Sequence, residues 1–191
     1  MKSKTTTTVF IMFILGIFMG AIDSGIVSPA REIIENSFDV GRNSGIWMIT
    51  LYTLCYAIAM PIVSKMADRK GHKKVFVFSV AFFGLGSLLC GLTNFYGNFT
   101  LFLLARVIQA VGAGGIMPIA TTVIGLGFPE EKRGFALGMV GAIFGVATII
   151  GPSLGSGILG LAGNNGWGWI FFINVPISLL IIFLSTRMEN T

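Results

Sequence analysis

Two charged side chains lie within long apolar runs of this sequence, where their types allow proton chemistry. Asp23 lies about two thirds of the way along the run 8–30, and Arg106 lies about seven residues into the run 99–126. An ionised side chain inside a bilayer costs at least ~2.5 kcal/mol, so such residues usually serve a purpose. At ~1.5 Å per residue both lie roughly 10 Å deep, so their depths match.

Two amides extend this polar level. Gln109 shares a helix face with Arg106 at i+3, and Asn174 lies about as deep in the run 167–186. Three helices would thus offer polar groups at one depth, as around a solvated cavity. Two interpretations stay open. Asp23 and Arg106 form a structural ion pair, or Asp23 alternates between protonated and ionised forms and exchanges a proton for a substrate.

Tyr52 and Tyr56 are candidates for the wall of the same cavity. Their i, i+4 spacing places them on one helix face. Aromatic faces attract organic cations, but tyrosines at this spacing also serve as packing or interface residues. The sequence therefore predicts a cavity lined by Tyr52, Tyr56, Gln109 and Asn174, with the structural alternative open for the tyrosines.

The composition of the chain places these residues in a membrane. The 191 residues are 54% hydrophobic and 11% charged, and their mean hydropathy is +0.86, whereas soluble chains carry roughly 25% charged residues. A crossing needs about 20 apolar residues, so six crossings fill the length and exclude a sizeable soluble domain. The sequence predicts an all-α, six-span bundle with spans at about 8–30, 45–66, 75–93, 99–126, 135–161 and 167–186.

The basic residues predict the orientation of the spans. Ten of the 13 Lys and Arg residues fall on one side, whereas Arg31 and Arg42 fall on the other and Arg106 lies inside a span. The positive-inside rule therefore predicts a multi-pass protein of the inner (cytoplasmic) membrane with both termini cytoplasmic. Four aromatic residues are expected at the outer interface. They are Trp47, Tyr96, Trp167 and Trp169.

Several classes of function are disfavoured. The basic residues lie in short gaps between spans and form no folded basic face for nucleic acid. Cys55 and Cys90 fall in apolar runs, so no disulfide or metal framework is implied. The single histidine, His72, lies in a basic loop, and no nucleophile-base pair or phosphate loop appears. We therefore expect neither an enzyme nor a bound cofactor or metal.

The segment 64–74 joins the second and third spans on the basic side. Gly71 allows a sharp turn, and Asp68 can accept backbone N–H bonds or face a helix N-terminus. With Arg69 and Lys73 these residues could form a salt-bridged latch at the cytoplasmic mouth. The alternative is a basic topology anchor.

The fifth span carries small residues at helical spacing. Gly134, Gly138, Gly141 and Gly145 share a face that would let a neighbouring helix approach closely. Pro152 removes a backbone donor and favours a kink. This span is therefore expected to act as a hinge or sliding surface.

A faint internal repeat accompanies these features. The segments 25–30 and 115–120 are similar and lie 90 residues apart. Three spans repeated with opposite topology would explain the match, and chance similarity between Gly/Ile/Ala-rich segments would explain it as well.

Three motifs resemble those of the major facilitator superfamily. Residues 67–74, Ala-Asp-Arg-Lys-Gly-His-Lys-Lys, resemble its loop motif G-x-L-A-D-R-x-G-R-K, with Ser64 at the leading Gly position. Residues 104–112, Leu-Ala-Arg-Val-Ile-Gln-Ala-Val-Gly, resemble its motif around a buried arginine. Residues 151–156, Gly-Pro-Ser-Leu-Gly-Ser, resemble its antiporter motif G-P-x-x-G-G, which the resemblance associates with export.

Two further segments narrow the resemblance to drug:proton antiporters of the QacA/EmrB kind, whose members usually have fourteen spans. They are residues 23–27, Asp-Ser-Gly-Ile-Val, and residues 167–177, Trp-Gly-Trp-Ile-Phe-Phe-Ile-Asn-Val-Pro-Ile. Gly168 stands where that family commonly has Arg, and Arg31 replaces an apolar residue. Both departures lie at the expected outer ends of the spans.

The resemblance implies roles for individual residues. Asp23 and Arg106 would take part in proton or cation coupling. Asp68, Arg69, Gly71 and Lys73 would form the cytoplasmic latch. A hinge, and an interface with the other half of the transporter, would form along the fifth span. Its residues are Gly145, Gly151, Pro152 and Gly155.

The expected function is export of amphipathic, cationic drugs in exchange for protons by alternating access. The chain would be the N-terminal six-helix half of the fold, built as a 3+3 inverted repeat and driven by the proton gradient without a cofactor. Its partners would be the bilayer, a small amphipathic substrate, and either an absent C-terminal half or a second copy, because the cavity lies between two halves. A polar-metabolite transporter and a truncated membrane protein that is inactive alone remain alternatives.

Overall fold

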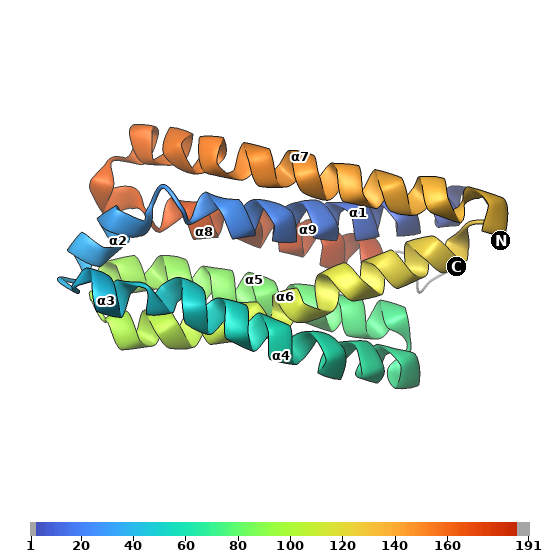
Figure 1. Cartoon of the computed structure of the whole chain (residues 1–191), viewed down its shortest axis with the longest axis horizontal. Coiled ribbons are helices and arrows are strands. Elements are labelled where there is room, and N and C mark those ends of the chain that lie inside the picture. The colour runs from blue at the N-terminus through green and yellow to red at the C-terminus, as the bar shows by residue number, and fades with distance from the viewer. Residues whose placement is uncertain (1–2, 187–191) are drawn as a thin grey trace.

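The computed structural model describes residues 3–186, and the side chains of residues 10–163 and 165–186. This part of the chain is helical without a strand (Figure 1). The elements are α1 (Ser3–Ile26), α2 (Arg31–Ser37), α3 (Arg42–Gly45), α4 (Trp47–Lys70), α5 (His72–Tyr96), α6 (Phe99–Gly127), α7 (Glu130–Ala162), η1 (Asn164–Gly166), α8 (Trp169–Phe172) and α9 (Asn174–Thr186). The expected all-α class is confirmed.

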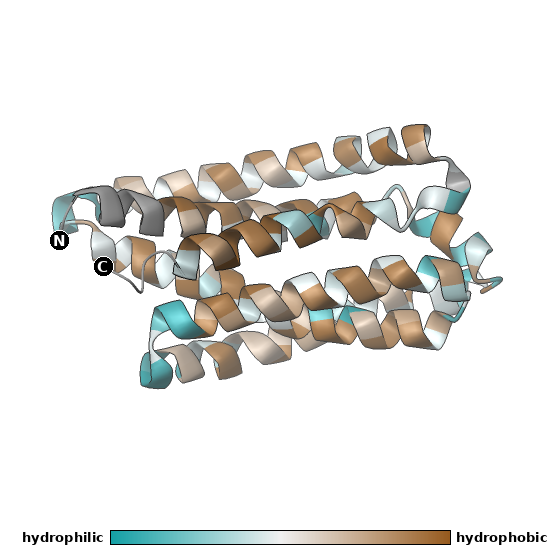
Figure 2. Ribbon diagram, turned by 180° about the vertical axis from the view of Figure 1, so that it is seen from behind, coloured by the Kyte–Doolittle hydropathy of each residue, from teal (hydrophilic) through white to brown (hydrophobic). Residues whose placement is uncertain are grey.

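Five of the helical stretches are long and apolar enough to cross a membrane, and six if a bent pair forms one span. The bent pair is Phe10–Ile26 with Arg31–Ser37, and its two parts differ in direction by 66°. The last stretch, Trp169–Thr186, combines α8 and α9. Hydrophilic residues gather at the two ends of the helices, and the segments between them are mostly hydrophobic (Figure 2).

The helices lie along one common direction, with their connections at two opposite ends (Figure 1). One end, here called the basic end, holds the start of α1, the close of α9 and the α4–α5 turn with its lysines. The other, here called the α2 end, holds α2 and α3. This arrangement places both ends of the described chain on the same side as the loop 64–74.

The helix contacts form a paired pattern. α1 packs mainly against α7, and α6 packs against α4 and α5, while α9 joins α5 and α1. If the first three spans (α1, α4, α5) are matched in order to the last three (α6, α7, α9), the pair α1–α7 corresponds to the pair α6–α4. α1, which ends within the segment 25–30, and α6, which carries the similar segment 115–120, are thus each flanked by one outer helix.

Local chemistry fixes the helix ends. Asn98 precedes α6, and its side-chain oxygen accepts a hydrogen bond from the Leu101 amide at 3.0 Å, which satisfies a donor left free by the helix start. Gly71 has φ +96° between α4 and α5. An L side chain rarely adopts this conformation, so glycine permits the direct helix-to-helix turn at the basic end.

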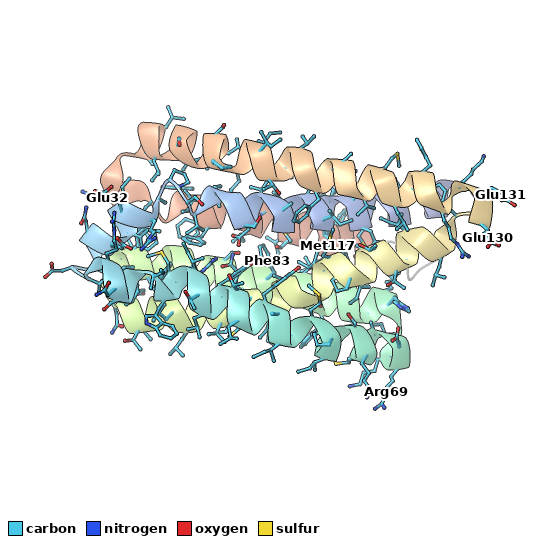
Figure 3. The ribbon with its side chains drawn as sticks, viewed as in Figure 1. Glu32, Arg69, Phe83, Met117, Glu130 and Glu131 are labelled. Carbon is cyan, nitrogen blue, oxygen red and sulfur yellow. The ribbon has the colours of Figure 1, made fainter. Side chains whose placement is uncertain are left out.

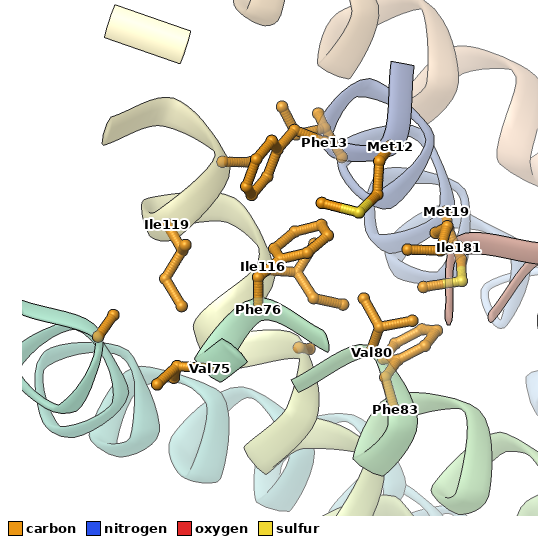
Figure 4. Close-up of a cluster of buried hydrophobic side chains, with 14 of the residues drawn as sticks. Met12, Phe13, Met19, Val75, Phe76, Val80, Phe83, Ile116, Ile119 and Ile181 are labelled. Atoms are coloured by element: carbon orange, nitrogen blue, oxygen red, sulfur yellow. The ribbon is translucent and has the colours of Figure 1, made fainter. Parts of the chain in front are cut away.

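The apolar core continues along the bundle in two clusters. Figure 4 shows the cluster toward the basic end, where Phe76 packs on Phe13 with ring centroids 4.4 Å apart. Residues of α1, α5, α6 and α9 meet there. The cluster joins α1 and α9 to α5 and α6, on the basic-end side of the buried polar residues.

The second cluster corrects the expectation for Trp167. Its side chain is fully buried rather than at an interface, and it packs among Phe38, Phe102 and Phe171. Its Nε1 has no hydrogen-bond partner within the described residues. The other three residues of the expected aromatic belt are exposed, as interface residues would be. They are Trp47, Tyr96 and Trp169.

The two family departures have local explanations. A Cβ at Gly168 would lie 2.7 Å from the Gly91 carbonyl oxygen of α5, so this backbone contact excludes a side chain such as Arg. Arg31 instead forms an ion pair within α2, with its Nε 2.8 Å from Glu35 Oε1.

Candidate proton and substrate site

The structure brings Asp23 together with three polar partners from two other helices. Asp23 lies near the end of α1 and is fully buried. Its Oδ1 accepts hydrogen bonds from Gln109 Nε2 at 2.8 Å and from Asn174 Nδ2 at 3.0 Å. Its Oδ2 accepts from Arg106 Nη1 at 3.4 Å. α1, α6 and α9 therefore meet at one carboxylate.

Arg106 is held on several sides. Its Nη1 donates to Gln109 Oε1 at 2.6 Å, and its Nε donates to the Met48 carbonyl at 3.4 Å. The guanidinium carbon lies 3.9 Å from the centroid of the Tyr52 ring and 5.7 Å from that of Phe171. Both distances fall within the ~6 Å range of a cation–π contact.

α5 adds two partners that the sequence did not reveal. Ser87 Oγ accepts from Gln109 Nε2 at 2.8 Å and from Asn174 Nδ2 at 3.4 Å. The Cys90 thiol donates to Gln109 Oε1 at 3.9 Å. Gly86 lets α5 approach this closely, because a Cβ there would overlap the Gln109 backbone. We call the set Asp23, Ser87, Cys90, Arg106, Gln109 and Asn174 the buried network.

The charges of the buried network balance only in one protonation state. Asp23 and Arg106 are 0% and 3% exposed, so water screens neither of them. When Asp23 is ionised, its charge neutralises the guanidinium. When Asp23 is protonated, Arg106 loses that counter-charge, and a buried charge without its partner is costly. Protonation of Asp23 therefore changes the charge of the Asp23–Arg106 pair from neutral to positive.

A cavity of about 230 Å³ lies beside the buried network. The rings of Tyr52 and Tyr56 are nearly parallel, 7° apart in plane with centroids 6.4 Å apart, and both line it. The other lining residues are Ile17, Gly20, Ala21, Ser24, Thr53, Ala113, Ile116, Met117 and Phe144. Four helices, α1, α4, α6 and α7, thus enclose a largely apolar space with a few hydroxyls.

The expectation for the two amides is wrong in one respect. Gln109 and Asn174 do not line this cavity with the tyrosines; they are 0% and 1% exposed and bind Asp23 within the network. Their amide groups make hydrogen bonds that an ionised carboxylate needs in an apolar interior. They hold the carboxylate and do not face the cavity.

A larger cleft of about 540 Å³ continues toward the basic end. Met117 lines both the cavity and the cleft, and it lies about halfway along the bundle (Figure 3). Thr121 and Thr122 of α6 line the cleft, and Arg133 of α7 lies at its mouth. The two spaces thus border on the same side chain, Met117.

The expected latch residues lie at the basic end and away from the network. Asp68 and Arg69 are in the last turn of α4, Gly71 makes the turn, and Lys73 lies in the first turn of α5. Arg69 projects from this end (Figure 3). Asp68 Oδ1 lies 3.3 Å from His72 Nε2, the one ion-pair contact that the described residues give it. Its side chain is 69% exposed.

The expected hinge residues of α7 divide between two faces. A Cβ at Gly151 would lie 2.9 Å from the Ile22 carbonyl oxygen, and one at Gly155 would lie 2.6 Å from that of Ile26. These two glycines and Pro152 face α1, so the expectation that they contact another half is wrong for Gly151 and Gly155. α7 also runs unbroken through Pro152.

The four glycines in the first half of α7 face open space. A Cβ would meet nothing within 4 Å of any of them. They are Gly134, Gly138, Gly141 and Gly145. No helix described here takes the close approach that their spacing predicted. Within the described residues, the glycines of α7 therefore provide one close helix contact, between Gly151, Gly155 and α1. The face with the first four glycines makes no such contact.

Nothing in the described part of the chain gathers three or more His, Cys, Asp or Glu side chains in an arrangement that could hold a metal ion. The chemistry available in the network is proton binding and hydrogen bonding. The chemistry available in the cavity is aromatic and apolar contact.

The arrangement of helices and motifs agrees with a comparison of the whole sequence. Residues 13–189 match the family model described as Major Facilitator Superfamily. The chain belongs to this superfamily. Members of this family are transporters, and the resemblance to the QacA/EmrB kind is confirmed by its relatives.

Two relatives have names that refer to multidrug resistance or multidrug export. Multidrug resistance protein 3 of Bacillus subtilis is 39% identical over 189 residues, 97% of this chain and 35% of that protein. Multidrug export protein EmrB of Haemophilus influenzae is 36% identical over 174 residues, 91% of this chain and 33% of that protein. The chain thus spans about a third of the length of these relatives.

A solved transporter shows the same fold. The proton:xylose symporter XylE superposes with a TM-score of 0.84 over 98% of this chain and 45% of that chain, at 13% identity. At this identity the likeness concerns the fold alone. It places the six-helix bundle as about half of a superfamily transporter.

Proposed function

We propose that this chain supplies the proton-coupling half of a transporter that exports amphipathic, cationic drugs in exchange for protons. The observation that carries the proposal is a fully buried carboxylate, Asp23, neutralised by one cation, Arg106, beside a cavity walled by two tyrosines. The drug-export names of the relatives support the substrate class.

The geometry suggests a cycle of alternating access. Asp23 takes a proton from water on the outer side, and its carboxyl then no longer neutralises Arg106. On the cytoplasmic side a lipophilic cation enters through the cleft past Met117 to the tyrosines. The proton leaves Asp23 for cytoplasmic water, and the cation is released outward when the access changes. No cofactor is needed, since the proton gradient supplies the energy.

The cycle requires a second half. The cavity borders α4 and α7, and among the described residues nothing lies within 4 Å of a Cβ built at Gly134, Gly138, Gly141 or Gly145 of α7. We propose that the remainder of a longer protein, or a second copy, covers these surfaces. In the inner membrane, the basic end would face the cytoplasm. The residues at this end that would form a latch against the second half are Asp68, Arg69, Gly71 and Lys73.

The test uses the full-length protein that carries this chain, in inside-out membrane vesicles. Energised vesicles should take up ethidium, and an uncoupler should abolish the uptake. Asp23→Asn should lower gradient-driven uptake by roughly 100-fold, because it removes the proton-binding group. Glu32→Gln is the matched control: Glu32 lies in α2, at the α2 end of the bundle (Figure 3) and outside the buried network, and should leave uptake unchanged.

Each outcome bears on one part of the proposal. Gradient-driven uptake that survives in Asp23→Asn would remove Asp23 from the coupling mechanism. Uptake of a polar metabolite without ethidium uptake would replace the drug-export assignment. Transport by the 191-residue chain alone, with cross-linked dimers, would identify a second copy as the other half.

A further inference from the structure

Tyr52 connects the cavity to the ion pair. Its ring lies 3.9 Å from the Arg106 guanidinium carbon, and Arg106 is paired with the Asp23 carboxylate. The same side chain lines the 230 Å³ cavity, which neither Asp23 nor Arg106 lines. Tyr52 is therefore the wall between a bound substrate and the charged pair.

Tyr56 provides a comparison one helical turn away. It lines the same cavity and is parallel to Tyr52. Among the described residues, however, the cation–π contacts of Arg106 are with Tyr52 and Phe171 and not with Tyr56. The two tyrosines thus offer similar surfaces to a ligand, but only Tyr52 touches the ion pair.

The shared ring has an electrostatic consequence. A cation is attracted to the negative face of an aromatic ring. An organic cation stacked on the cavity side of Tyr52 would lie roughly 8 Å from the Arg106 guanidinium, given contact distances of about 4 Å on either side of the ring. Two positive charges at that separation repel each other, and the repulsion is smallest when Asp23 is ionised.

We propose that Tyr52 couples substrate binding to proton release, because a cation on its ring favours the ionised form of the Asp23–Arg106 pair. The proposal rests on the proposed function and adds a positioning residue to it. The proton that leaves the Asp23 carboxyl passes to water on the cytoplasmic side, and the carboxylate keeps the electron pair of the O–H bond.

The other groups around the pair do not connect it to the cavity. Gln109, Asn174 and Ser87 are neutral and lie within the buried network. The Cys90 thiol faces Gln109 on the α5 side. The Phe171 ring lies 5.7 Å from the guanidinium carbon and is fully buried among aromatic side chains. Tyr52 is thus the contact that a cavity ligand can perturb.

The experiment measures protons released on ligand binding by the purified full-length protein in weakly buffered detergent. Tetraphenylphosphonium is the probe, its binding is followed by calorimetry, and a pH indicator counts protons. Wild-type protein should release protons as the cation binds, and Asp23→Asn should release none. Tyr52→Leu should still bind, about 3- to 10-fold more weakly, but should release less than about half as many protons per bound cation.

Two variants separate coupling from simple binding. Tyr56→Leu should lose a similar part of the affinity and, at saturation, release as many protons as the wild type. Tyr52→Phe keeps the ring and loses the hydroxyl, so it should also release protons as the wild type does. Tyr96→Leu, at an exposed position of α5, should change neither quantity.

The outcomes distinguish this proposal from the proposed function. If the wild type releases no proton on binding, the proposed antiport fails. If the wild type releases protons and Tyr52→Leu releases as many at saturation, the coupling role of Tyr52 is overturned. A loss of release in Tyr52→Phe would overturn the ring-based mechanism. Equal proton losses in Tyr52→Leu and Tyr56→Leu would do the same.

Discussion

The buried network and the segment 64–74 at the α4–α5 turn are both rich in polar groups. They differ in how many hydrogen bonds and ion pairs the described residues give these groups. Asp23 receives three hydrogen bonds and is fully buried. Asp68 has an exposed side chain and, within the described residues, one contact with His72. The network is satisfied by side chains of four helices, α1, α5, α6 and α9, whereas the Asp68 side chain at the α4–α5 turn is left largely exposed.

The two faces of α7 repeat this contrast. At Gly151 and Gly155 the backbone of α1 lies close enough to clash with an added Cβ. At Gly138 and Gly145 no described residue lies within 4 Å of an added Cβ. Substitutions on the completed side should therefore affect the stability of the six-helix unit itself. Substitutions on the open side should affect only a process that needs the second half.

The largest effect is expected at Arg106. Arg106→Leu leaves Asp23 buried without its cation and should lower the unfolding free energy of the chain by about 3–5 kcal/mol. Denaturant titration in detergent, followed by circular dichroism, measures it. Asp23→Asn in the same chain should recover much of the loss, because the unpaired charge is removed.

The Arg31–Glu35 pair of α2 is the comparison, with side chains that are 29% and 9% exposed. Arg31→Ala should cost about 1 kcal/mol, less than Arg106→Leu, because water still reaches the Arg31 end of this pair. Equal losses in Arg31→Ala and Arg106→Leu would contradict the distinction between completed and open regions.

A smaller effect is expected from the glycines of α7. Gly155→Leu inserts a side chain against the Ile26 carbonyl and should destabilise the bundle by about 1–3 kcal/mol. Gly138→Leu, on the same helix but facing open space, should leave the stability of this chain unchanged and should slow transport by the full-length protein. The same titration together with ethidium uptake checks both. Equal destabilisation by the two would show that the open face is packed.

The smallest effect on stability is expected at Asp68. Asp68→Asn removes a charge from an exposed side chain and should change the unfolding free energy by less than about 0.5 kcal/mol. Transport by the full-length protein should nevertheless fall about 3- to 10-fold if the loop gates a conformational step. Unchanged transport would leave the loop as a topology anchor.

The sequence predicted the helical class and the polar level because few charges occur in long apolar runs. Asp23, Arg106, Gln109 and Asn174 could be related by depth alone. Ser87 and Cys90 could not, since small polar residues are common in apolar helices and only the α5–α6 register brings them to Gln109. Spacing likewise grouped Gly134 to Gly145 on one face of α7 but could not say that α1 would meet Gly151 and Gly155 instead.

The close α5–α6 contact constrains how water can arrive at Asp23. A Cβ at Gly112 would overlap the Phe83 backbone, just as one at Gly86 would overlap that of Gln109, so the two helices touch through their main chains (Figure 4 shows Phe83). Such a seam cannot open by small side-chain rearrangements. α5 and α6 should therefore move together as one unit, and water should reach Asp23 from a side other than the α5–α6 seam.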